Sequence, residues 1–169
     1  GITPSGEFHI GHLREILSAE MIHRACLDAE IESNYIFIVD SMNPLRRVYD
    51  FLSPEYERYI GNPLAYIPAP DLDGKPGDGS STYAEHFLGP FLNALEQIGV
   101  RPEVVMNHET YESGDFAHYI DTAISKKEEI REIIQDVSGR ELADDWFPYK
   151  PMGSDGSLDG VTVTSYEKP

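Results

Sequence analysis

The sequence has 169 residues, 40% of them hydrophobic, and a formal net charge of −17, which fits one globular domain and excludes a disordered chain. No apolar run approaches the roughly 18 residues that span a bilayer, and no basic segment precedes an apolar one at the front, so we expect a cytoplasmic protein without a membrane partner. The charge is −5 over residues 1–60 (five basic minus ten acidic) and −12 over residues 61–169 (eight minus twenty), so this chain alone should hold nucleic acid weakly.

The first predicted elements are the end of a strand, a tight turn and a helix. Gly1–Thr3 has the composition of a strand end, and the next three residues contain Pro and Gly. Apolar residues then recur at helical spacing from about residue 9 to residue 29. The only cysteine, Cys26, lies on this helix as a small apolar residue, which excludes an internal disulfide and an all-cysteine metal site.

A second strand completes a βαβ unit. Residues 35–39 (YIFIV) form a continuous β-branched and aromatic run that ends at Asp40, which predicts a strand buried on both faces. Six prolines and four glycines follow between residues 42 and 81. That stretch should be mostly irregular, with a short helix near residues 54–60.

The remaining elements complete an α/β pattern. Helices are predicted over residues 82–98 and 114–137, with Gly99 and Gly139 just beyond their ends, and a third strand over residues 103–107. The tail after residue 150 is rich in Gly, Ser and Asp, and its residues 161–164 (VTVT) predict one last short strand.

The pattern predicts an α/β fold around a parallel sheet. Ligands of such sheets bind in the crevice beyond the carboxyl ends of the strands. Residues 3–6, 40–42 and 107–108 all follow predicted strands at that edge. We therefore expect three separate stretches of the chain to meet at one cleft.

The start of the first helix carries two histidines three residues apart. His9 and His12 fall on one face of the first turn, where each imidazole can donate a hydrogen bond to a phosphate oxygen. The backbone amides of a helix start form an anion site aided by the helix dipole. The turn that leads into this site consists of Pro4, Ser5 and Gly6.

A His-x-Gly-His pattern is short and occurs by chance, so its context decides its meaning. Here it follows a strand and a turn and opens the helix of a βαβ unit, which favours a phosphate site over two partly exposed histidines. Gly11 has no side chain and lets a flat ring lie close to the helix. The geometry suits the triphosphate of ATP and the charge that develops on it during attack at the α-phosphorus.

The opening segment resembles the signature region of class I aminoacyl-tRNA synthetases, and most closely that of class I lysyl-tRNA synthetase. The segments that carry the resemblance, in the order of the family, are "GITPSGEFHIGHLRE", "FIVDSMNPLRRV", "YIGNPL", "IPAPD", "SSTYAEHFLGPFL" and "SGRELADDWFPYKP". They extend over nearly the whole chain. The assignment of lysine as substrate rests on this resemblance alone.

The resemblance implies a Rossmann-like, HUP-type nucleotide-binding fold of which only the first half is present. Residues 1–150 would form that half of the catalytic domain, and residues 151–169 would begin a connective insertion. The implied enzyme is a lysine-tRNA ligase. It uses ATP, together with Mg2+, to convert L-lysine to lysyl-adenylate, and then transfers the lysyl group to the 3′-terminal adenosine of tRNA(Lys).

The resemblance also assigns residues. His9 and His12 would contact the ATP phosphates, and Gly11 would lie under the adenine, while Gly1 and Thr3 would line the lysine pocket. Asp40 would belong to the same cleft and bind an ammonium group. A carboxylate that caps the end of a strand is an equal alternative for Asp40. Arg46 and Arg47 could reach phosphate or tRNA, but a solvated pair is the simpler interpretation.

The sequence departs from the family in three respects. It has no KMSKS-like loop, no second half of the nucleotide fold, and no cysteines after Pro151, where family members often carry a zinc-binding insertion. We therefore expect no zinc site and no metal-ligating residues in this chain, and a fragment that does not catalyse lysylation alone.

Two other functions stay open from the residues. A small nucleotidylyltransferase or pantothenate-synthetase-like ligase has a similar phosphate site but acts on a small molecule without tRNA. A nucleotide-binding remnant without catalysis is the second alternative. Among synthetases, glutamate, glutamine, cysteine and arginine are other possible substrates, against which the later segments argue.

Overall fold

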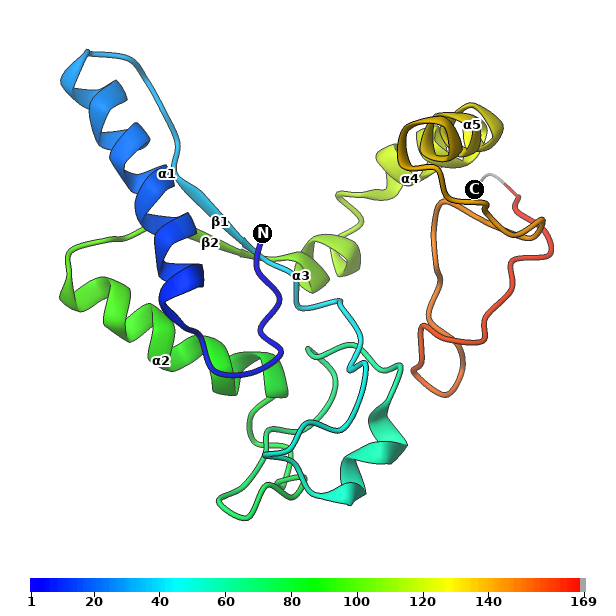
Figure 1. Ribbon diagram of the computed structural model, residues 1–169, viewed down its shortest axis with the longest axis horizontal. Coiled ribbons are helices and arrows are strands. Elements are labelled where there is room, and N and C mark those ends of the chain that lie inside the picture. The colour runs from blue at the N-terminus through cyan, green and yellow to red at the C-terminus, as the bar shows by residue number, and fades with distance from the viewer. Residues whose placement is uncertain (168–169) are drawn as a thin grey trace.

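The computed structural model describes residues 1–167 and shows an α/β fold whose strands pair in parallel (Figure 1). Its elements in chain order are α1 (Ile10–Asp28), β1 (Ile36–Val39), the 3-10 helix η1 (Pro54–Tyr59), α2 (Tyr83–Gln97), β2 (Glu103–Met106), α3 (Asn107–Glu112), α4 (Ala117–Ser125) and α5 (Lys127–Ser138). The expected helices near both histidines and after residue 82 are confirmed, as are the strands near residues 36 and 103.

The first strand of the chain is reduced to one bridge, which lies on the other side of β1 from β2. β1 and β2 are parallel, with Ile36 opposite Glu103 and Val39 opposite Met106. On the opposite edge, the amide of Ile2 donates to the carbonyl oxygen of Ile38 at 3.1 Å, and the amide of Asp40 donates to the carbonyl oxygen of Ile2 at 2.9 Å. The order across the sheet is therefore Ile2, β1, β2.

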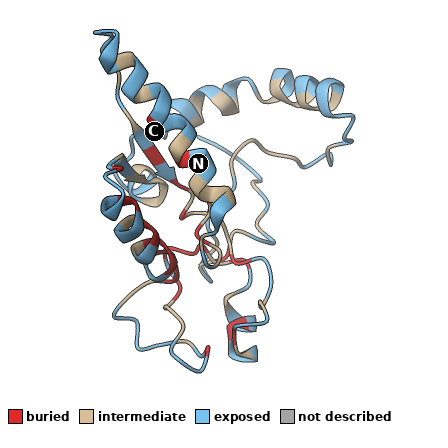
Figure 2. Cartoon of the chain, turned by 60° about the vertical axis from the view of Figure 1, so that its left-hand side comes forward, coloured by how far each residue is buried: buried red, intermediate tan, exposed pale blue. Residues whose placement is uncertain are grey.

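Both long helices pack on one face of the sheet. Ile16 of α1 and Phe91 of α2 belong to the same buried cluster as Phe37 and Val39 of β1. The alternate residues of β1, Ile36 and Ile38, are 49% and 47% exposed. The expectation that this strand is buried on both faces is wrong, because no described helix covers the second face (Figure 2).

The proline-rich stretch from residue 42 to residue 81 packs around a second core. It is irregular apart from η1, as expected, yet its apolar side chains are buried. The residues of this cluster are Leu45, Leu52, Tyr56, Leu64, Ile67, Tyr83, Ala84 and Phe87. Since Tyr83, Ala84 and Phe87 belong to α2, this helix joins the loop to the sheet.

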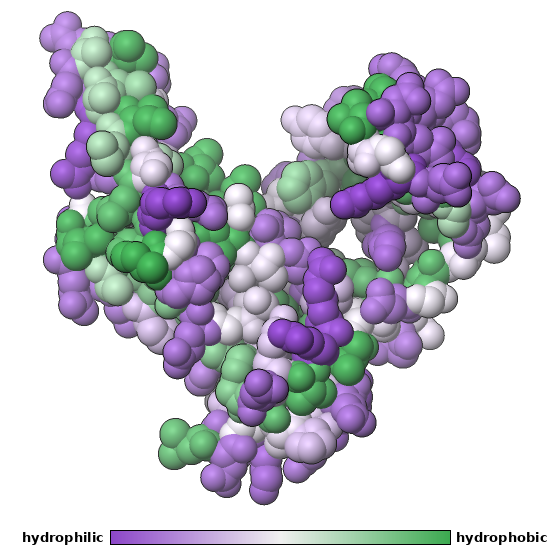
Figure 3. Space-filling view, in the orientation of Figure 1, coloured by the Kyte–Doolittle hydropathy of each residue, from purple (hydrophilic) through white to green (hydrophobic). Residues whose placement is uncertain are grey.

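The C-terminal third differs from the sequence prediction. The helix expected over residues 114–137 is two helices, α4 and α5, separated at Lys126, whose backbone angles are φ −106° and ψ 20°. Neither helix has a buried residue, and both stand apart from α1 and α2 with a mostly hydrophilic surface on the face seen in Figure 3. Gly139 ends α5 with φ 65°, as its position predicts.

The tail runs back to the proline-rich stretch. The amide of Leu158 donates to the carbonyl oxygen of Gly61 at 2.8 Å, and the side-chain amide of Asn62 donates to the carbonyl oxygen of Asp155 at 3.4 Å. The strand expected over residues 161–164 is absent from the described structure, because no strand lies beside that segment to pair with it. The last two residues of the expected insertion, 168 and 169, lie outside the described residues.

Candidate functional site

Hydrogen bonds tie the three strand ends together at one edge of the sheet, as expected. The side-chain amide of Asn43 donates to the Thr3 hydroxyl at 2.6 Å. The Oδ1 atom of Asn107 accepts the amide of Met42 at 2.8 Å and the hydroxyl of Ser41 at 3.0 Å. The ends of Ile2, β1 and β2 therefore form one polar surface at the carboxyl edge.

The turn before α1 is held from below by α2. The amide of Ser5 donates to the carbonyl oxygen of Thr3 at 2.9 Å, which closes the turn. The hydroxyl of Tyr83, a fully buried side chain, donates to the carbonyl oxygen of Ser5 at 2.8 Å. Pro4 is also fully buried, and a Cβ atom at Gly6 would lie 3.5 Å from the Phe51 ring. The turn is thus a packed support for the helix start.

The two histidines form a reciprocal cap on α1. The amide of Gly11 donates to Nδ1 of His9 at 3.0 Å, and the amide of His9 donates to Nδ1 of His12 at 3.2 Å. The two rings stack with centroids 3.9 Å apart and planes inclined by 26°. A nitrogen that accepts an N–H cannot carry a hydrogen, so both neutral imidazoles must be protonated at Nε2. The cap therefore leaves two Nε2–H donors beside the helix start.

The environment of the pair favours the neutral form of His12. Its pKa is lowered from 6.5, first by burial and second by repulsion from His9, while Glu15 acts in the opposite direction. Gly11 is required by the cap itself. A Cβ atom at Gly11 would lie 2.8 Å from Cε1 and 2.9 Å from Nδ1 of His9, so a side chain here would displace the His9 ring from the cap.

Asp40 presents a carboxylate at the end of β1. A Cβ atom at Gly1 would lie 2.8 Å from Oδ1 of Asp40, so Gly1 leaves room for this carboxylate. The backbone of Asp40 is bonded to Ile2 and Asn43, but its side chain accepts no hydrogen bond from any residue between 1 and 167. The strand-capping alternative finds no support in these contacts, because a capping carboxylate would accept a backbone amide.

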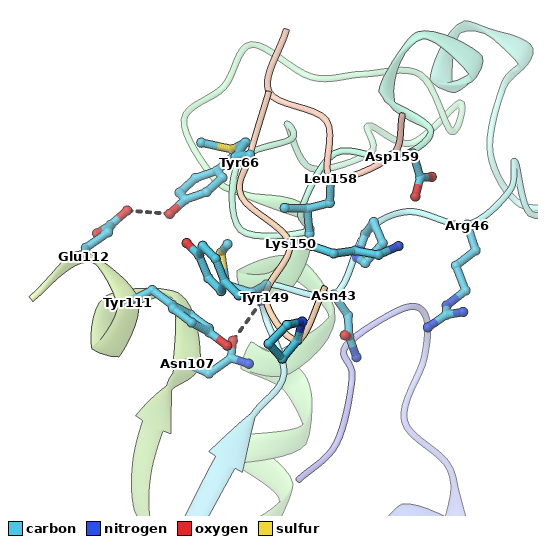
Figure 4. A pocket seen from close by; sticks show the side chains of 14 residues that line it. Asn43, Arg46, Tyr66, Asn107, Tyr111, Glu112, Tyr149, Lys150, Leu158 and Asp159 are labelled. Carbon is cyan, nitrogen blue, oxygen red and sulfur yellow. Dashed lines mark hydrogen bonds between the residues drawn. The ribbon is translucent and has the colours of Figure 1, made fainter. Parts of the chain in front are cut away.

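Two kinds of cavity flank the turn. Two small cavities of about 300 Å3 each lie beside the helix start and share Phe8, Phe91 and Ala94; one of them includes His9 and the other His86. A cavity of about 540 Å3 lies at the carboxyl ends of β1 and β2, lined by Asn43 and Asn107 (Figure 4).

The sequence did not identify the side-chain contacts that support this edge. The site is supported by hydrogen bonds that no local sequence pattern predicts, made by Tyr83, Asn43 and Asn107. Glu85 is part of a capping box at the start of α2. Its carboxylate accepts the backbone amide of Thr82 at 2.8 Å, a bond that lowers its pKa.

The described residues 1–167 contain no group of three or more His, Cys, Asp or Glu side chains that could hold a metal ion. Within the same range, no helix is both long and apolar enough to cross a membrane.

Comparison with known proteins gives a consistent result over the whole chain. A profile of the family described as "tRNA synthetases class I (K)" matches residues 1–169. The chain is 41% identical to a lysine–tRNA ligase of Picrophilus torridus, over 100% of this chain and 32% of that protein. It is 42% identical to lysine–tRNA ligase 1 of Methanosarcina acetivorans, over 99% of this chain and 30% of that protein. It is 41% identical to a lysine–tRNA ligase of Archaeoglobus fulgidus, over 99% of this chain and 33% of that protein. The chain thus spans about a third of the length of these relatives.

Proposed function

Because the chain belongs to the class I (K) tRNA synthetase family, we propose that it provides the ATP-phosphate site of an enzyme that joins lysine to tRNA(Lys). The relatives that match its full length are named lysine–tRNA ligases. The observation that carries the proposal is the reciprocal cap, which occupies both Nδ1 atoms and so leaves the Nε2–H groups of two histidines as donors at one helix start. A small-molecule nucleotidylyltransferase is not favoured, because the named relatives act as tRNA ligases.

The proposed reaction has two steps. The carboxylate of lysine attacks the α-phosphorus of ATP, the bond to the β-phosphate breaks, and pyrophosphate leaves. A ribose hydroxyl at the 3′ end of the tRNA then attacks the carbonyl carbon of lysyl-adenylate, and AMP leaves. The first step builds negative charge on the phosphates, which hydrogen-bond donors held in place can stabilise.

In the first step, His9 and His12 donate from Nε2 to phosphate oxygens. The turn made of Pro4, Ser5 and Gly6 holds the amides of the helix start toward the same anion. Gly11 keeps the His9 ring folded over the helix and leaves room for the adenine. ATP would enter as its Mg2+ complex, in which the metal would supply positive charge at the phosphates.

Lysine would lie at the carboxyl edge beside the turn. Gly1 and Thr3 provide the floor of this pocket, and Asp40 binds an ammonium group of the amino acid. The free carboxylate of Asp40 and the space that Gly1 leaves for it support this assignment. Residues 1–150 would then form the first half of the nucleotide fold, and residues 151–169 the start of an insertion.

Calorimetric titration of the 169-residue chain with Mg·ATP tests the proposal. The variants His9→Ala and His12→Ala should each weaken ATP binding by about tenfold to a hundredfold, since each removes one hydrogen bond to a charged group. His118→Ala, on the exposed α4, is the matched control and should bind as the parent chain does. Titration with L-lysine should give heat that Asp40→Asn abolishes. Unchanged ATP binding in both histidine variants would rule out the phosphate site.

The same chain should not catalyse lysylation of tRNA, because the sequence lacks a KMSKS-like loop. A rate above background in a filter assay with radioactive lysine would contradict this.

A further inference from the structure

The residue that follows Asp40 carries a buried hydroxyl. Ser41 has an exposed fraction of 0%, although it lies in the turn after β1 and belongs to no helix or strand. A hydroxyl that is removed from water costs free energy unless it forms hydrogen bonds inside the protein. The partners of Ser41 therefore show what holds this turn in place.

Both side-chain partners of Ser41 come from the residues directly after β2. The Oγ atom of Ser41 lies 3.0 Å from Oδ1 of Asn107 and 2.8 Å from Nδ1 of His108. The backbone amide of His108 donates to the same Oγ atom at 3.3 Å. The buried hydroxyl thus joins the end of β1 to the end of β2.

The three contacts are satisfied together by one arrangement of hydrogens. The Oδ1 atom of Asn107 can only accept, and it also accepts the amide of Met42, so the single hydroxyl hydrogen of Ser41 is donated to it. The Oγ atom then accepts from His108, whose Nδ1 atom must carry a hydrogen. His108 therefore differs from His9 and His12, whose Nδ1 atoms are acceptors.

Other side chains surround the His108 ring. The Tyr66 ring meets it edge-on, with centroids 5.9 Å apart and planes inclined by 86°, and the Tyr66 hydroxyl donates to Glu112 at 2.6 Å. Glu85 of α2 is also near: its pKa is lowered first by the hydrogen bond from the Thr82 amide, and the charge of His108 adds to this effect. His108 does not line the cavity of about 540 Å3, so it can act on a ligand there only through its neighbours.

The turn that His108 holds carries Asp40. Because the Asp40 carboxylate accepts no hydrogen bond from residues 1–167, its direction follows from the backbone of the turn. The amide of Asp40 donates to the carbonyl oxygen of Ile2 at 2.9 Å, and the amide of Ala65 donates to the carbonyl oxygen of Ser41 at 3.0 Å. The bond from Nδ1 of His108 fixes the side of the turn that faces β2.

We propose that His108 is a positioning residue, which holds the Asp40 carboxylate beside Gly1 by donating from Nδ1 to the Ser41 hydroxyl. This inference rests on the proposed function, in which that carboxylate binds an ammonium group of lysine. Without the Nδ1 donor, the buried hydroxyl loses a partner and the turn can adopt other orientations. Lysine selects the present orientation, so its affinity falls with the fraction of chains that keep it.

Two substitutions of similar polarity separate positioning from packing. The side-chain nitrogen introduced by His108→Asn lies as many bonds from the backbone as Nδ1 and can donate to Ser41, whereas the nitrogen introduced by His108→Gln corresponds to Nε2. In calorimetric titration of the 169-residue chain, His108→Gln should weaken L-lysine binding about fivefold, the usual effect of one hydrogen bond between neutral groups. His108→Asn should bind lysine as the parent chain does. Both variants should bind Mg·ATP unchanged, because the histidine cap lies on α1. His118→Gln on the exposed α4 is the matched control.

NMR provides a measurement that needs no ligand. The nitrogen chemical shifts of the His108 ring should show a hydrogen on Nδ1. The carboxyl carbon resonance of Asp40 should move in His108→Gln and stay in place in His108→Asn. Urea denaturation of both variants measures any general loss of stability, which a residue that only packs would lose equally in the two.

Three results would each overturn the inference: no hydrogen on Nδ1, an Asp40 resonance that does not move in His108→Gln, or lysine binding that falls equally in the two variants. If the parent chain bound no lysine, the lysine pocket of the proposed function would fall. The Asp40 resonance would still decide whether His108 positions the carboxylate.

Discussion

At the scale of single residues, the helix cap fixes one tautomer of the neutral His9 and His12 rings. Each Nδ1 atom accepts a backbone amide of the same helix start, so the helix cap and the Nε2–H donors depend on the same neutral rings. Helix capping and phosphate binding are therefore coupled. A change that protonates either Nδ1 atom removes a cap and turns the ring away from its present orientation.

The first prediction concerns pH. The pKa of His12 is below 6.5 in the folded chain, so the folded state binds fewer protons than the unfolded state as the pH falls through this range. The stability from neutral His12 is fully present above about pH 6.5 and is lost as the pH falls through its folded pKa. NMR titration of the His12 ring should show the lowered pKa. His9→Ala should raise this pKa only in part, because burial is the larger cause. A His12 pKa above 6.5 would contradict the cap.

The second prediction separates helix formation from ligand binding. Gly11→Ala should favour the helix by intrinsic propensity, by up to about 1 kcal/mol. Its Cβ atom would lie 2.8 Å from the His9 ring and push that ring out of the cap. We expect weaker Mg·ATP binding by tenfold or more, with helicity measured by circular dichroism kept or increased. Gly89→Ala on α2, where a Cβ atom meets nothing within 4 Å, is the control for helix propensity.

The sequence predicted which residues belong to this site, but it did not predict which residues they contact. A strand, a turn and a helix start around His9 predicted a phosphate site, and the strand ends predicted where Asp40 would lie. The tyrosine contact that supports Ser5 joins residues 78 positions apart. Such a contact follows from packing of α2 under the turn, which no local pattern specifies.

At the scale of elements, α2 has the strongest local signals and the largest structural role. It begins with a reciprocal capping box between Thr82 and Glu85, and it packs against both the sheet and the proline-rich loop. Its amphipathic pattern, its cap and Gly99 beyond its end all agree, and the predicted bounds are within two residues of the observed ones.

The third prediction tests that cap. Thr82→Ala removes the hydroxyl that accepts the Glu85 amide at 3.2 Å, so the free energy of unfolding should fall by about 1 kcal/mol. Urea denaturation followed by circular dichroism measures this loss. Thr122→Ala within α4 is the matched control, since that exposed hydroxyl bonds only the carbonyl oxygen of His118 in its own helix. Equal losses in the two variants would mean that the box has no capping role.

The weaker elements were the ones that the sequence mispredicted. Residues 161–164 have strand composition, but a strand needs a neighbour to bond, and none lies there. The helix expected over residues 114–137 breaks at Lys126, because neither α4 nor α5 buries a side chain that would keep both on one axis. Local composition predicts neither the lack of a neighbouring strand nor the break at Lys126.

At the scale of the whole molecule, the sheet divides the chain into a covered side and a bare side. Phe37 is 3% exposed under α1 and α2, whereas its neighbour Ile38 is 47% exposed on the other face. Composition predicted a strand suited to burial on both faces. Which face is covered depends on how the helices connect, so the sequence of β1 could not reveal it.

The fourth prediction compares the loss of stability on substitution of Phe37 with that on substitution of Ile38. Phe37→Ala should lower the free energy of unfolding by about 3–5 kcal/mol, the usual loss for a buried aromatic side chain. Ile38→Thr, on the bare face, should change it by less than about 1 kcal/mol, because the side chain is already half in water. Thermal and urea denaturation measure both values. Comparable losses would mean that another part of the chain covers this face in solution.

The docking of the tail on Gly61 and Asn62 has a consequence for the order in which the molecule assembles. Asn62 and Asp155 are 93 positions apart, and closing a loop of that length costs roughly 4 kcal/mol of chain entropy. The two hydrogen bonds that hold the tail at Gly61 and Asn62 offset little of this cost before the sheet and its helices have formed. The tail should therefore dock after the rest of the fold and detach before it. The wall that the tail gives to the cavity of about 540 Å3 can therefore open while the helix start and both strands stay intact.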